Sequence, residues 1–324
     1  MCHAAAVSRT HPRLGDLVPT PVFVMQPFTR QAGLASGLTD RRMQGAEYRR
    51  LFFGVYVHRD APASPALWAQ GAKLIAPQGA FAAYQTAARI LGGIVPHTPD
   101  THLGSTGRGS MAVRGLRLHV YAVPPPLVDI DGLPVTSPAQ TFADLSRVLG
   151  LVDLVVLGDS LVHAGRITPA DLSDAMEQSR VPRLARLAAA YVRAGAESPG
   201  ETRMRMLYRL AGLPEPRTQV VVDRDNGRSF RLDIGWDEVQ AGSEYDGAHH
   251  DDPAQAELDG ARRDELADLG WRYTVVRASG IHATPGETIS RMWALLQERG
   301  MRVGRLKQGW QTHFPGYAAR PQSA

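Results

Sequence analysis

The C-terminal third of the chain constrains the fold most, because its turn signals and apolar patterns define the order of its elements. It begins with a helix whose start is specified by Ser198 as N-cap, Pro199 at the first helical position and Glu201 three residues after the cap. Gly212 marks the end of this helix. Three strands follow in TQVVVD, SFRLDIGW and EVQAGSEYDG, then a helix over about 257–269 and a last strand, WRYTVVRAS. The sequence therefore predicts an α/β core in this part of the chain.

Carboxylates stand in two of these predicted strands. Alternation in SFRLDIGW places Asp233 on the face opposite the apolar side chains of Leu232, Ile234 and Trp236. Glu244 comes eleven residues later, and Asp246 lies on the same face of its strand as Glu244. Carboxylates on two neighbouring strands can bring their oxygens to one point, and Mg²⁺ prefers such ligands while keeping positions for water and phosphate. The pattern indicates phosphodiester hydrolysis, for which a metal neutralises phosphate charge and lowers the pKa of a bound water.

The two strands share a longer pattern, D-(10 residues)-E-Y-D-G-x-x-H, formed by Asp233, Glu244, Tyr245, Asp246, Gly247 and His250. Together with the preceding E-S-P-x-E-T-R and a following D-(10 residues)-G-W, it resembles the very-short-patch-repair-like branch of the PD-(D/E)XK nucleases. The similarity runs roughly from Glu197 to Val276. The predicted order of helix, three strands, helix and strand is also that of the restriction-endonuclease-like core.

This resemblance implies a metal site and a general base. It makes Asp233 the central metal ligand, and Glu244 a second ligand or a carboxylate close to the metal. The carbonyl of Tyr245 adds a third oxygen, and His250 is the base that activates water. The implied cofactor is Mg²⁺, with Mn²⁺ as a substitute, and the implied substrate is DNA.

The chain departs from the wider superfamily at Asp246, where a lysine usually stands two residues after the acid. Its only lysines are Lys73, in another block, and Lys307, outside the core. The role of the missing lysine therefore falls to His250 or to an arginine such as Arg231, or the site is inactive.

Structural explanations remain open for several of these residues. Asp233 could pair with an arginine at the sheet edge, because a carboxylate in an apolar strand needs a partner. Asp246 begins a turn-like Asp-Gly dipeptide. His249 competes with His250 for a place in the site, and Glu201 is explained by its role as the capping acid.

The N-terminal block has the order helix, glycine turn, helix and hairpin, which is that of a winged helix-turn-helix. Thr29 caps a first short helix, Thr39 caps a second, and an aromatic strand-like run covers Leu51–His58. In such a module the second helix lies in the major groove and the wing approaches phosphates. The candidate DNA contacts are Asp40, Arg41, Arg42 and Gln44 on this helix, and Arg49 and Arg50 at the wing. The alternative is a small helical cap whose arginines are only solvated.

The middle block shows no recognisable chemistry. The sequence predicts a helix with apolar side chains from Phe81 to Leu91, a turn GSTGRGS, a strand GLRLHVYAV and a helix capped by Ser137. Three polar residues fall on helical segments without a converging partner and are interpreted as surface or structural residues: Asp144, Asp159 and His163.

Short motifs run through the first two blocks: F-T-R (28–30), G-L-T (37–39), G-V-Y-V (54–57), Q-T-A-A-R (85–89) and G-L-P-V-T-S-P-A-Q-T (132–141). Through them the region 28–178 resembles the N-terminal part of actinobacterial proteins related to the abortive-infection antitoxin of type IV toxin-antitoxin systems. The chain departs at Gln140, where such proteins more often carry arginine. The resemblance implies sequence-specific, autoregulatory DNA binding, with a cognate toxin protein as a partner.

Composition narrows the class of protein. The 324 residues include 36 Lys and Arg against 32 Asp and Glu, a formal net charge of +4, which is only permissive for nucleic-acid binding. A single cysteine excludes an internal disulfide and a cysteine-based zinc site. No stretch reaches the roughly 18 to 20 apolar residues of a membrane span. We therefore expect a soluble, cytoplasmic protein with no membrane partner.

Together the blocks predict an α/β multidomain chain. The expected parts are a disordered lead (1–27), a winged helix-turn-helix (28–62), an antitoxin-like α/β domain (63–180), a restriction-endonuclease-like α/β domain (181–300) and a tail (301–324). Two functions fit this organisation. One is a Mg²⁺-dependent DNA endonuclease guided by the winged helix. The other is a non-enzymatic DNA-binding transcriptional regulator or antitoxin with a degenerate nuclease-fold domain.

Overall fold

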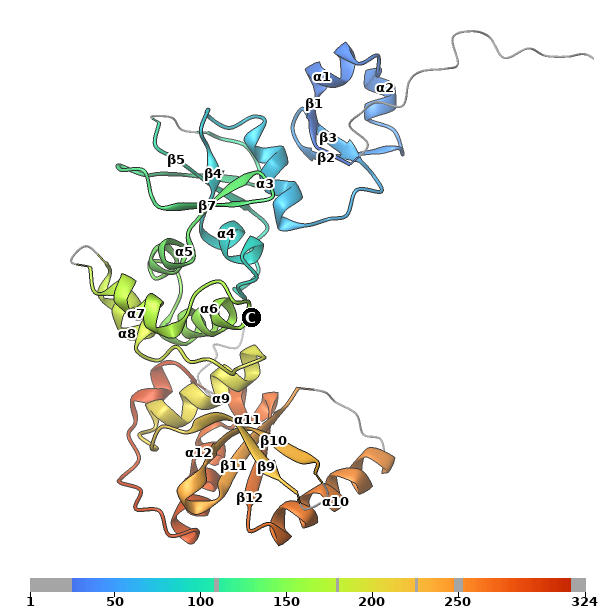
Figure 1. Cartoon of the computed structure of the whole chain (residues 1–324). Coiled ribbons are helices and arrows are strands. Elements are labelled where there is room, and N and C mark those ends of the chain that lie inside the picture. Colours follow the sequence, from blue (N-terminus) through green and yellow to red (C-terminus); the bar gives the residue numbers. More distant parts are fainter. Residues whose placement is uncertain (1–24, 108–110, 179–180, 225–226, 248–252, 316–324) are drawn as a thin grey trace, which may run out of the picture. The chain divides into compact units, whose positions relative to one another are not determined.

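The structure is a computed structural model (Figure 1) that describes residues 25–107, 111–178, 181–224, 227–247 and 253–315, with only the backbone over 253–259. The chain divides into two compact units. Unit 1 comprises Met1–Phe81 and Pro99–Ala122, and unit 2 comprises Ala82–Thr98 and Val123–Ala324. The described residues form helices and three sheets, so the predicted α/β class is confirmed.

Unit 1 begins with β1 (Phe28–Thr29), α1 (Arg30–Ala35), α2 (Asp40–Met43), β2 (Tyr48–Phe52) and β3 (Val55–His58). The hydroxyls of Thr29 and Thr39 each accept a backbone N–H at 3.2 Å, from Ala32 and Arg42, which confirms both predicted caps. The strands form an antiparallel sheet in the order β1-β3-β2. Buried side chains join this sheet to the two helices: Phe28, Leu38, Met43, Tyr48 and Tyr56.

The rest of unit 1 contains α3 (Pro65–Lys73), β5 (Thr101–Ser105) and β6 (Leu116–Val120), and β5 pairs with β6 in parallel. The predicted turn GSTGRGS starts too early, because Gly104 belongs to β5. A Cβ atom at Gly104 would lie 2.2 Å from the ring of Phe81, so this position has room only for glycine. The end of that turn, 108–110, lies outside the described residues.

His102 on β5 and His119 on β6 form a close imidazole pair. Nδ1 of His102 lies 2.9 Å from Nε2 of His119, and the stacked rings have centroids 5.2 Å apart. One nitrogen must donate and the other must accept, so the contact needs at least one neutral ring. Burial, and then the charge of Arg117, lower the pKa of His119.

We expect this pair to make unit 1 sensitive to acid. Because the folded pKa of His119 lies below its unfolded value of about 6.5, the pair contributes stability above that pH and loses it as the pH falls through the folded pKa. Amide hydrogen exchange in β5 and β6, corrected for intrinsic rates, should accelerate in this range, and His119→Phe should reduce the acceleration. Unchanged protection on acidification would contradict the prediction.

The first part of unit 2 is mostly helical: α4 (Tyr84–Ile90), β7 (Leu127–Ile130), β8 (Leu133–Thr136), α5 (Pro138–Leu145), α6 (Leu151–His163), α7 (Pro169–Met176) and α8 (Arg183–Ala189). Its strands β7 and β8 pair antiparallel, and Val135 of β8 pairs in parallel with Ala82 of β4 (Phe81–Ala82). Ser137 accepts the N–H of Gln140 at 3.2 Å, which confirms the predicted cap. The helix expected from Phe81 begins only at Tyr84, because the backbone is still extended at Ala83.

The second part of unit 2 contains α9 (Pro199–Leu210), β9 (Arg217–Asp223), β10 (Ser229–Trp236), the 3-10 turn η1 (Asp237–Val239), β11 (Ala241–Asp246), α10 (Pro253–Asp268), β12 (Arg272–Arg277), α11 (Ala278–His282), α12 (Pro285–Glu298) and η2 (Gly309–Thr312). The sheet has the order β12-β11-β10-β9, and only the β11–β12 pair is parallel. The element order expected from the sequence is therefore present.

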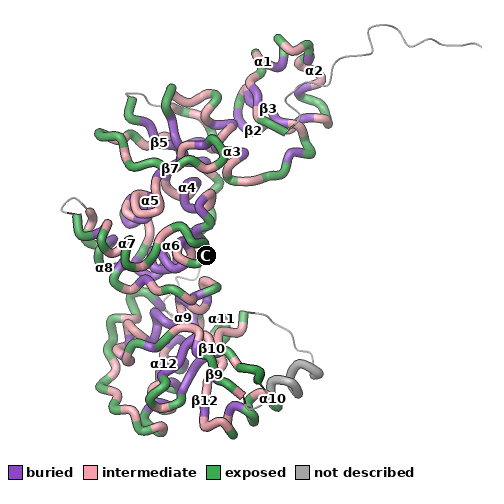
Figure 2. The backbone as a smooth tube through the Cα atoms, viewed as in Figure 1, coloured by how far each residue is buried: buried purple, intermediate pink, exposed green. Residues whose placement is uncertain are grey.

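Helices α6 and α9 join the two parts of unit 2 through buried surfaces (Figure 2). Arg205 of α9 has no exposed side-chain surface and donates to Asp159 of α6 at 2.7 Å. The same carboxylate accepts the backbone N–H of Arg193 at 2.8 Å and the hydroxyl of Thr202 at 2.9 Å. Asp159 was interpreted from the sequence as a surface or a structural residue, and these contacts make it a buried structural residue. The boundary predicted at 180/181 falls inside this unit, and α8 beyond it packs against α6.

Candidate functional site: carboxylates on β10 and β11

Asp233 is the half-buried carboxylate at the centre of the candidate site. Its Oδ2 accepts the backbone N–H of Tyr245 at 2.7 Å, so the side chain bonds to the neighbouring strand β11. The antiparallel register between β10 and β11 begins with Ile234 opposite Ser243. Asp233 is the residue just before Ile234, where this ladder stops. Burial raises the pKa of Asp233 to about 6, the Tyr245 hydrogen bond opposes this, and the charges of Glu201 and Glu197 add to it.

The simple alternation predicted for β10 is wrong at this position. Leu232 packs in a cluster with Val220, Leu266 and Trp271. A Cβ atom at Gly235 would meet Val220 and Trp271 of the same cluster, so residues 232 and 235 face the same side. In the neighbouring strand β9, Gln219 has a φ of 50°. The register omits the pair Asp233–Gln219 between Leu232–Val220 and Ile234–Thr218 without shifting, so Asp233 lies at a gap in this ladder.

Two glutamates at the start of α9 surround Asp233 with further negative charge. The hydroxyl of the predicted cap Ser198 accepts the N–H of Glu201 at 3.2 Å. Glu201 in turn accepts the N–H of Glu197 at 2.9 Å, one residue before the N–H expected for a capping box, and it also accepts from Gln219 Nε2 at 3.2 Å. Glu197 binds both terminal nitrogens of Arg231, at 2.8 and 2.9 Å. Sequence reasoning gave Glu201 only a capping role. A role of Glu201 beside Asp233 could have been inferred from the cap itself, because the cap fixes the Glu201 carboxylate at the start of α9, beside the sheet.

Glu244 has a different neighbour, which the sequence did not indicate. Its carboxylate, 18% exposed, pairs with Arg262 of α10. The same nitrogen of Arg262 donates to the backbone carbonyl of Arg231 at 3.1 Å. Asp246, two residues further on, pairs with Arg277 at 3.2 Å. The contacts of the described residues thus direct Asp233 toward the start of α9 and Glu244 toward α10.

The remaining predicted ligands are placed only in part. The ring of Tyr245 lies against the first turn of α9, where a Cβ atom at Gly200 would be 2.0 Å from it. His249 and His250 lie outside the described residues. The part of the chain that the structure describes contains no group of three or more His, Cys, Asp or Glu side chains arranged to hold a metal. The oxygen donors and surplus negative charge around Asp233 nevertheless fit a hard dication.

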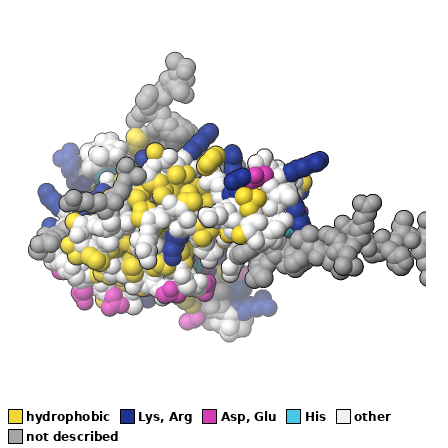
Figure 3. Space-filling model, turned by 90° about the horizontal axis from the view of Figure 1, so that it is seen from above, with side chains coloured by type: hydrophobic (Ala, Val, Ile, Leu, Met, Phe, Trp, Pro, Cys, Tyr) yellow, Lys and Arg dark blue, Asp and Glu magenta, His cyan; other side chains and the backbone are white. Residues whose placement is uncertain are grey.

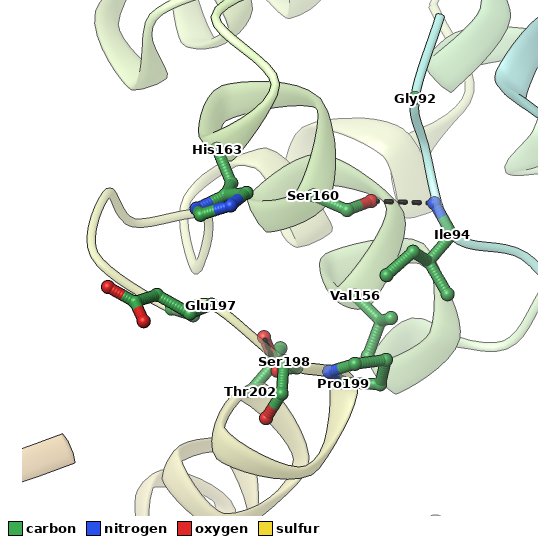
Figure 4. A pocket seen from close by; sticks show the side chains of 10 residues that line it. Gly92, Ile94, Val156, Ser160, His163, Glu197, Ser198, Pro199 and Thr202 are labelled. Atoms are coloured by element: carbon green, nitrogen blue, oxygen red, sulfur yellow. Dashed lines mark hydrogen bonds between the residues drawn. The ribbon is translucent and has the colours of Figure 1, made fainter. Parts of the chain in front are cut away.

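A small pocket lies between α6 and the start of α9 (Figure 4). It measures about 40 Å³ and is lined by residues that include Ser160, His163, Glu197 and Thr202. The Ser160 hydroxyl accepts the backbone N–H of Ile94 at 2.8 Å, which closes one side. Ligand pockets for drug-sized molecules measure about 300–1,000 Å³, so this space is too small for a nucleotide.

The predicted DNA contacts of unit 1 fall into two groups. Arg42 is bound by Glu47 through two hydrogen bonds of 2.7 and 2.8 Å, and half-buried Arg49 donates to the carbonyl of Ala61. Asp40 is paired with Arg30. Exposed positions whose side chains make no hydrogen bond or ion pair among the described residues are Arg41, Gln44 and Arg50. On the face shown in Figure 3, Lys and Arg side chains are spread out rather than gathered in one patch.

Comparison with known proteins identifies similar proteins, but these do not indicate an activity. No family model matches the chain. Two curated proteins of Mycobacterium tuberculosis, from strains CDC 1551 / Oshkosh and H37Rv, are each 26% identical over 249 residues, covering 75% of this chain and 90% of the relative. Both are described as uncharacterized proteins. Among the described helices, none has the length and apolar character needed to cross a membrane.

Proposed function

We propose that unit 2 hydrolyses phosphodiester bonds of DNA with Mg²⁺ bound at the carboxylates of β10 and β11. One observation carries the proposal: Asp233 is a partly buried carboxylate among other carboxylates, with its pKa raised to about 6. Such a group is costly to keep ionised without a cation, and the described residues give it no ion-pair partner. Perturbed carboxylates of this kind gather at functional sites. The pattern shared with the PD-(D/E)XK nucleases points to the same chemistry.

In this proposal the ligands are Asp233, the carbonyl of Tyr245 and Glu244, whose carboxylate turns from Arg262 toward Asp233 when the metal binds. When bound, Mg²⁺ supplies charge neutralisation at the phosphate and a water of lowered pKa. The chain holds Asp233 in place through the N–H of Tyr245. His250, which lies outside the described residues, accepts the proton of the attacking water.

The proposal is tested by nicking of supercoiled DNA with the full chain and Mg²⁺ or Mn²⁺. Asp233→Ala should abolish cleavage, because it removes the central ligand. His250→Ala should keep metal binding and slow cleavage by about 10²- to 10⁴-fold, the usual contribution of a positioned base. A folded wild-type chain that leaves supercoiled, linear and single-stranded DNA intact with both metals would refute the proposal.

A non-enzymatic DNA-binding regulator is the second candidate, and one observation favours it. Glu244 and Asp246, which flank the proposed ligand Tyr245, are already neutralised by Arg262 and Arg277. A degenerate site would keep such internal pairs permanently. In that case the chain should bind DNA through unit 1 and show no heat of Mn²⁺ binding.

Both candidates require DNA binding by unit 1, and its salt dependence tests which arginines contribute. Because Arg41 and Arg50 are exposed, the double variant Arg41→Ala/Arg50→Ala should flatten the plot of log affinity against log salt by up to about 2, at roughly 0.9 per lost phosphate contact. Arg117→Ala removes an exposed arginine of unit 1 outside this face and should leave the slope unchanged. Equal slopes for the wild type and the double variant would show that neither arginine contacts a DNA phosphate.

A further inference from the structure

Arg262 stands between the two carboxylate-bearing strands. Its guanidinium pairs with Glu244 of β11 and donates to the carbonyl of Arg231 on β10 at 3.1 Å. It also lies 5.6 Å from the centre of the Phe230 ring, and Arg224 lies 4.6 Å from the same centre. Arg262 is therefore a cation that contacts both β10 and β11, and it pairs with Glu244, which is proposed above as a metal ligand.

The guanidinium does not use all of its donors in this position. Among the described residues, the hydrogen bonds of Arg262 to Glu244 and to the carbonyl of Arg231 both come from one terminal nitrogen, Nη2. Its Nε is buried and has no hydrogen-bond partner among the described residues. An arginine engaged by a carboxylate in fork geometry would use two nitrogens, as Arg231 does with Glu197. The contact with Glu244 thus leaves the arginine with unused capacity for an anion.

The chain has no lysine to supply positive charge at this place. Lys307 lies against Gly212, where a Cβ atom would be 3.0 Å from its side chain, and Lys73 ends α3 in unit 1. Position 246 is an aspartate bound to Arg277. An arginine cannot act as a base, since it keeps its proton at any working pH, but it can hold phosphate oxygens firmly.

We propose that Arg262 is the counter-ion that Glu244 releases when a divalent cation binds, and the group that then holds a phosphate oxygen of the substrate. The inference rests on the proposed function for the second role but not for the first. In the first role the arginine and the metal compete for one carboxylate. In the second, the released guanidinium faces the added negative charge of the DNA strand and stabilises it during hydrolysis without giving up its proton.

The competition gives substitutions at Arg262 two effects of opposite sign. Arg262→Gln removes the competing charge, so the dissociation constant for Mn²⁺, measured by calorimetry on the full chain, should fall by about three- to tenfold, a typical range for one partly exposed charge pair. Cleavage with saturating metal should fall by about 10²-fold or more, as for the loss of one aligned donor. Arg262→Lys keeps the charge and should keep the wild-type Mn²⁺ affinity while cleaving more slowly, because it lacks the fork.

Arg224→Gln is the matched control. This arginine contacts the same ring, but it pairs with Glu265, which is no proposed ligand, so the Mn²⁺ affinity should not change. In a Glu244→Gln background, Arg262→Gln should no longer strengthen metal binding, because nothing is left to compete for. Circular dichroism of every variant establishes that it is folded.

The outcomes separate the two claims. Weaker or unchanged Mn²⁺ binding by folded Arg262→Gln overturns the counter-ion role, as does a wild type and an Arg262→Gln variant that both give no heat. Tighter binding with no cleavage by the wild type supports the counter-ion role and rejects the proposed nuclease. Tighter binding with undiminished cleavage overturns only the phosphate-holding role.

Discussion

Replacing Arg205 by methionine is expected to destabilise unit 2 by about 3–5 kcal/mol, the usual cost of leaving one member of a buried ion pair without its partner. The side chains of Arg205 and Asp159 are 0% and 1% exposed, so water cannot compensate the remaining carboxylate. Burial already raises the pKa of Asp159 against the opposing charge of Arg205. The measurement is the urea midpoint of the full chain, followed by a signal from α6 and α9.

The same two helices provide the control for this prediction. Arg203 of α9 also pairs with a carboxylate of α6, Asp153 at 2.8 Å, but these side chains are 26% and 38% exposed. Arg203→Met should therefore cost only about 0–1 kcal/mol. The double variant Asp159→Leu/Arg205→Met should recover much of the loss, because no buried charge remains. Similar costs for Arg205→Met and Arg203→Met would contradict the prediction.

The pair also decides which fragments of the chain can be studied. A fragment that starts at residue 181 would contain Arg205 but lack Asp159 and the surface of α6 that α9 covers. It would carry a buried cation without its partner. We therefore expect metal binding and cleavage to be measurable on the full chain or on a fragment that includes α6.

Features set by local sequence could be predicted. The caps at Thr29, Thr39, Ser137 and Ser198 all occur as expected, because an N-cap depends on residues within one helical turn. The strand SFRLDIGW matches β10 in full, since its β-branched and aromatic side chains favour an extended chain. Local signals were therefore sufficient for the order of elements from α9 to β12.

Features set by distant partners could not be predicted. Asp159 and Arg205 are 46 residues apart, and nothing in either helix indicates the other. The pairing of Arg262 with Glu244 depends on which side of α10 packs on the sheet. The weakly amphipathic sequence of α10 does not indicate that side. The left-handed conformation of Gln219, opposite Asp233, could not be foreseen, because a glutamine gives no sign of a positive φ. The strands that carry the candidate carboxylates could thus be predicted from the sequence, but the side chains that contact these carboxylates could not.

Asp233→Asn should abolish metal-dependent cleavage and, at the same time, stabilise the chain at alkaline pH. The folded pKa of Asp233, about 6, lies above its ordinary value of 3.8. A carboxyl group shifted in this direction contributes stability below the unfolded pKa and loses it as the pH rises through the folded one. At pH 8 the wild type has lost this contribution, whereas asparagine stays neutral and can still accept the N–H of Tyr245.

The expected gain for Asp233→Asn is about 1 kcal/mol at pH 8, a discounted figure because the carboxyl is partly exposed, and it should vanish near pH 4. Asp246→Asn is the control: it changes a nearby carboxylate that is paired with Arg277, so it should give no alkaline gain. Adding Mn²⁺ should raise the melting temperature of the wild type and not that of Asp233→Asn. An aspartate that binds no metal would show the same alkaline gain on replacement, but Mn²⁺ would leave the melting temperature of the wild type unchanged. The response of the melting temperature to Mn²⁺ therefore distinguishes a ligand from a structural residue without any assay of DNA cleavage.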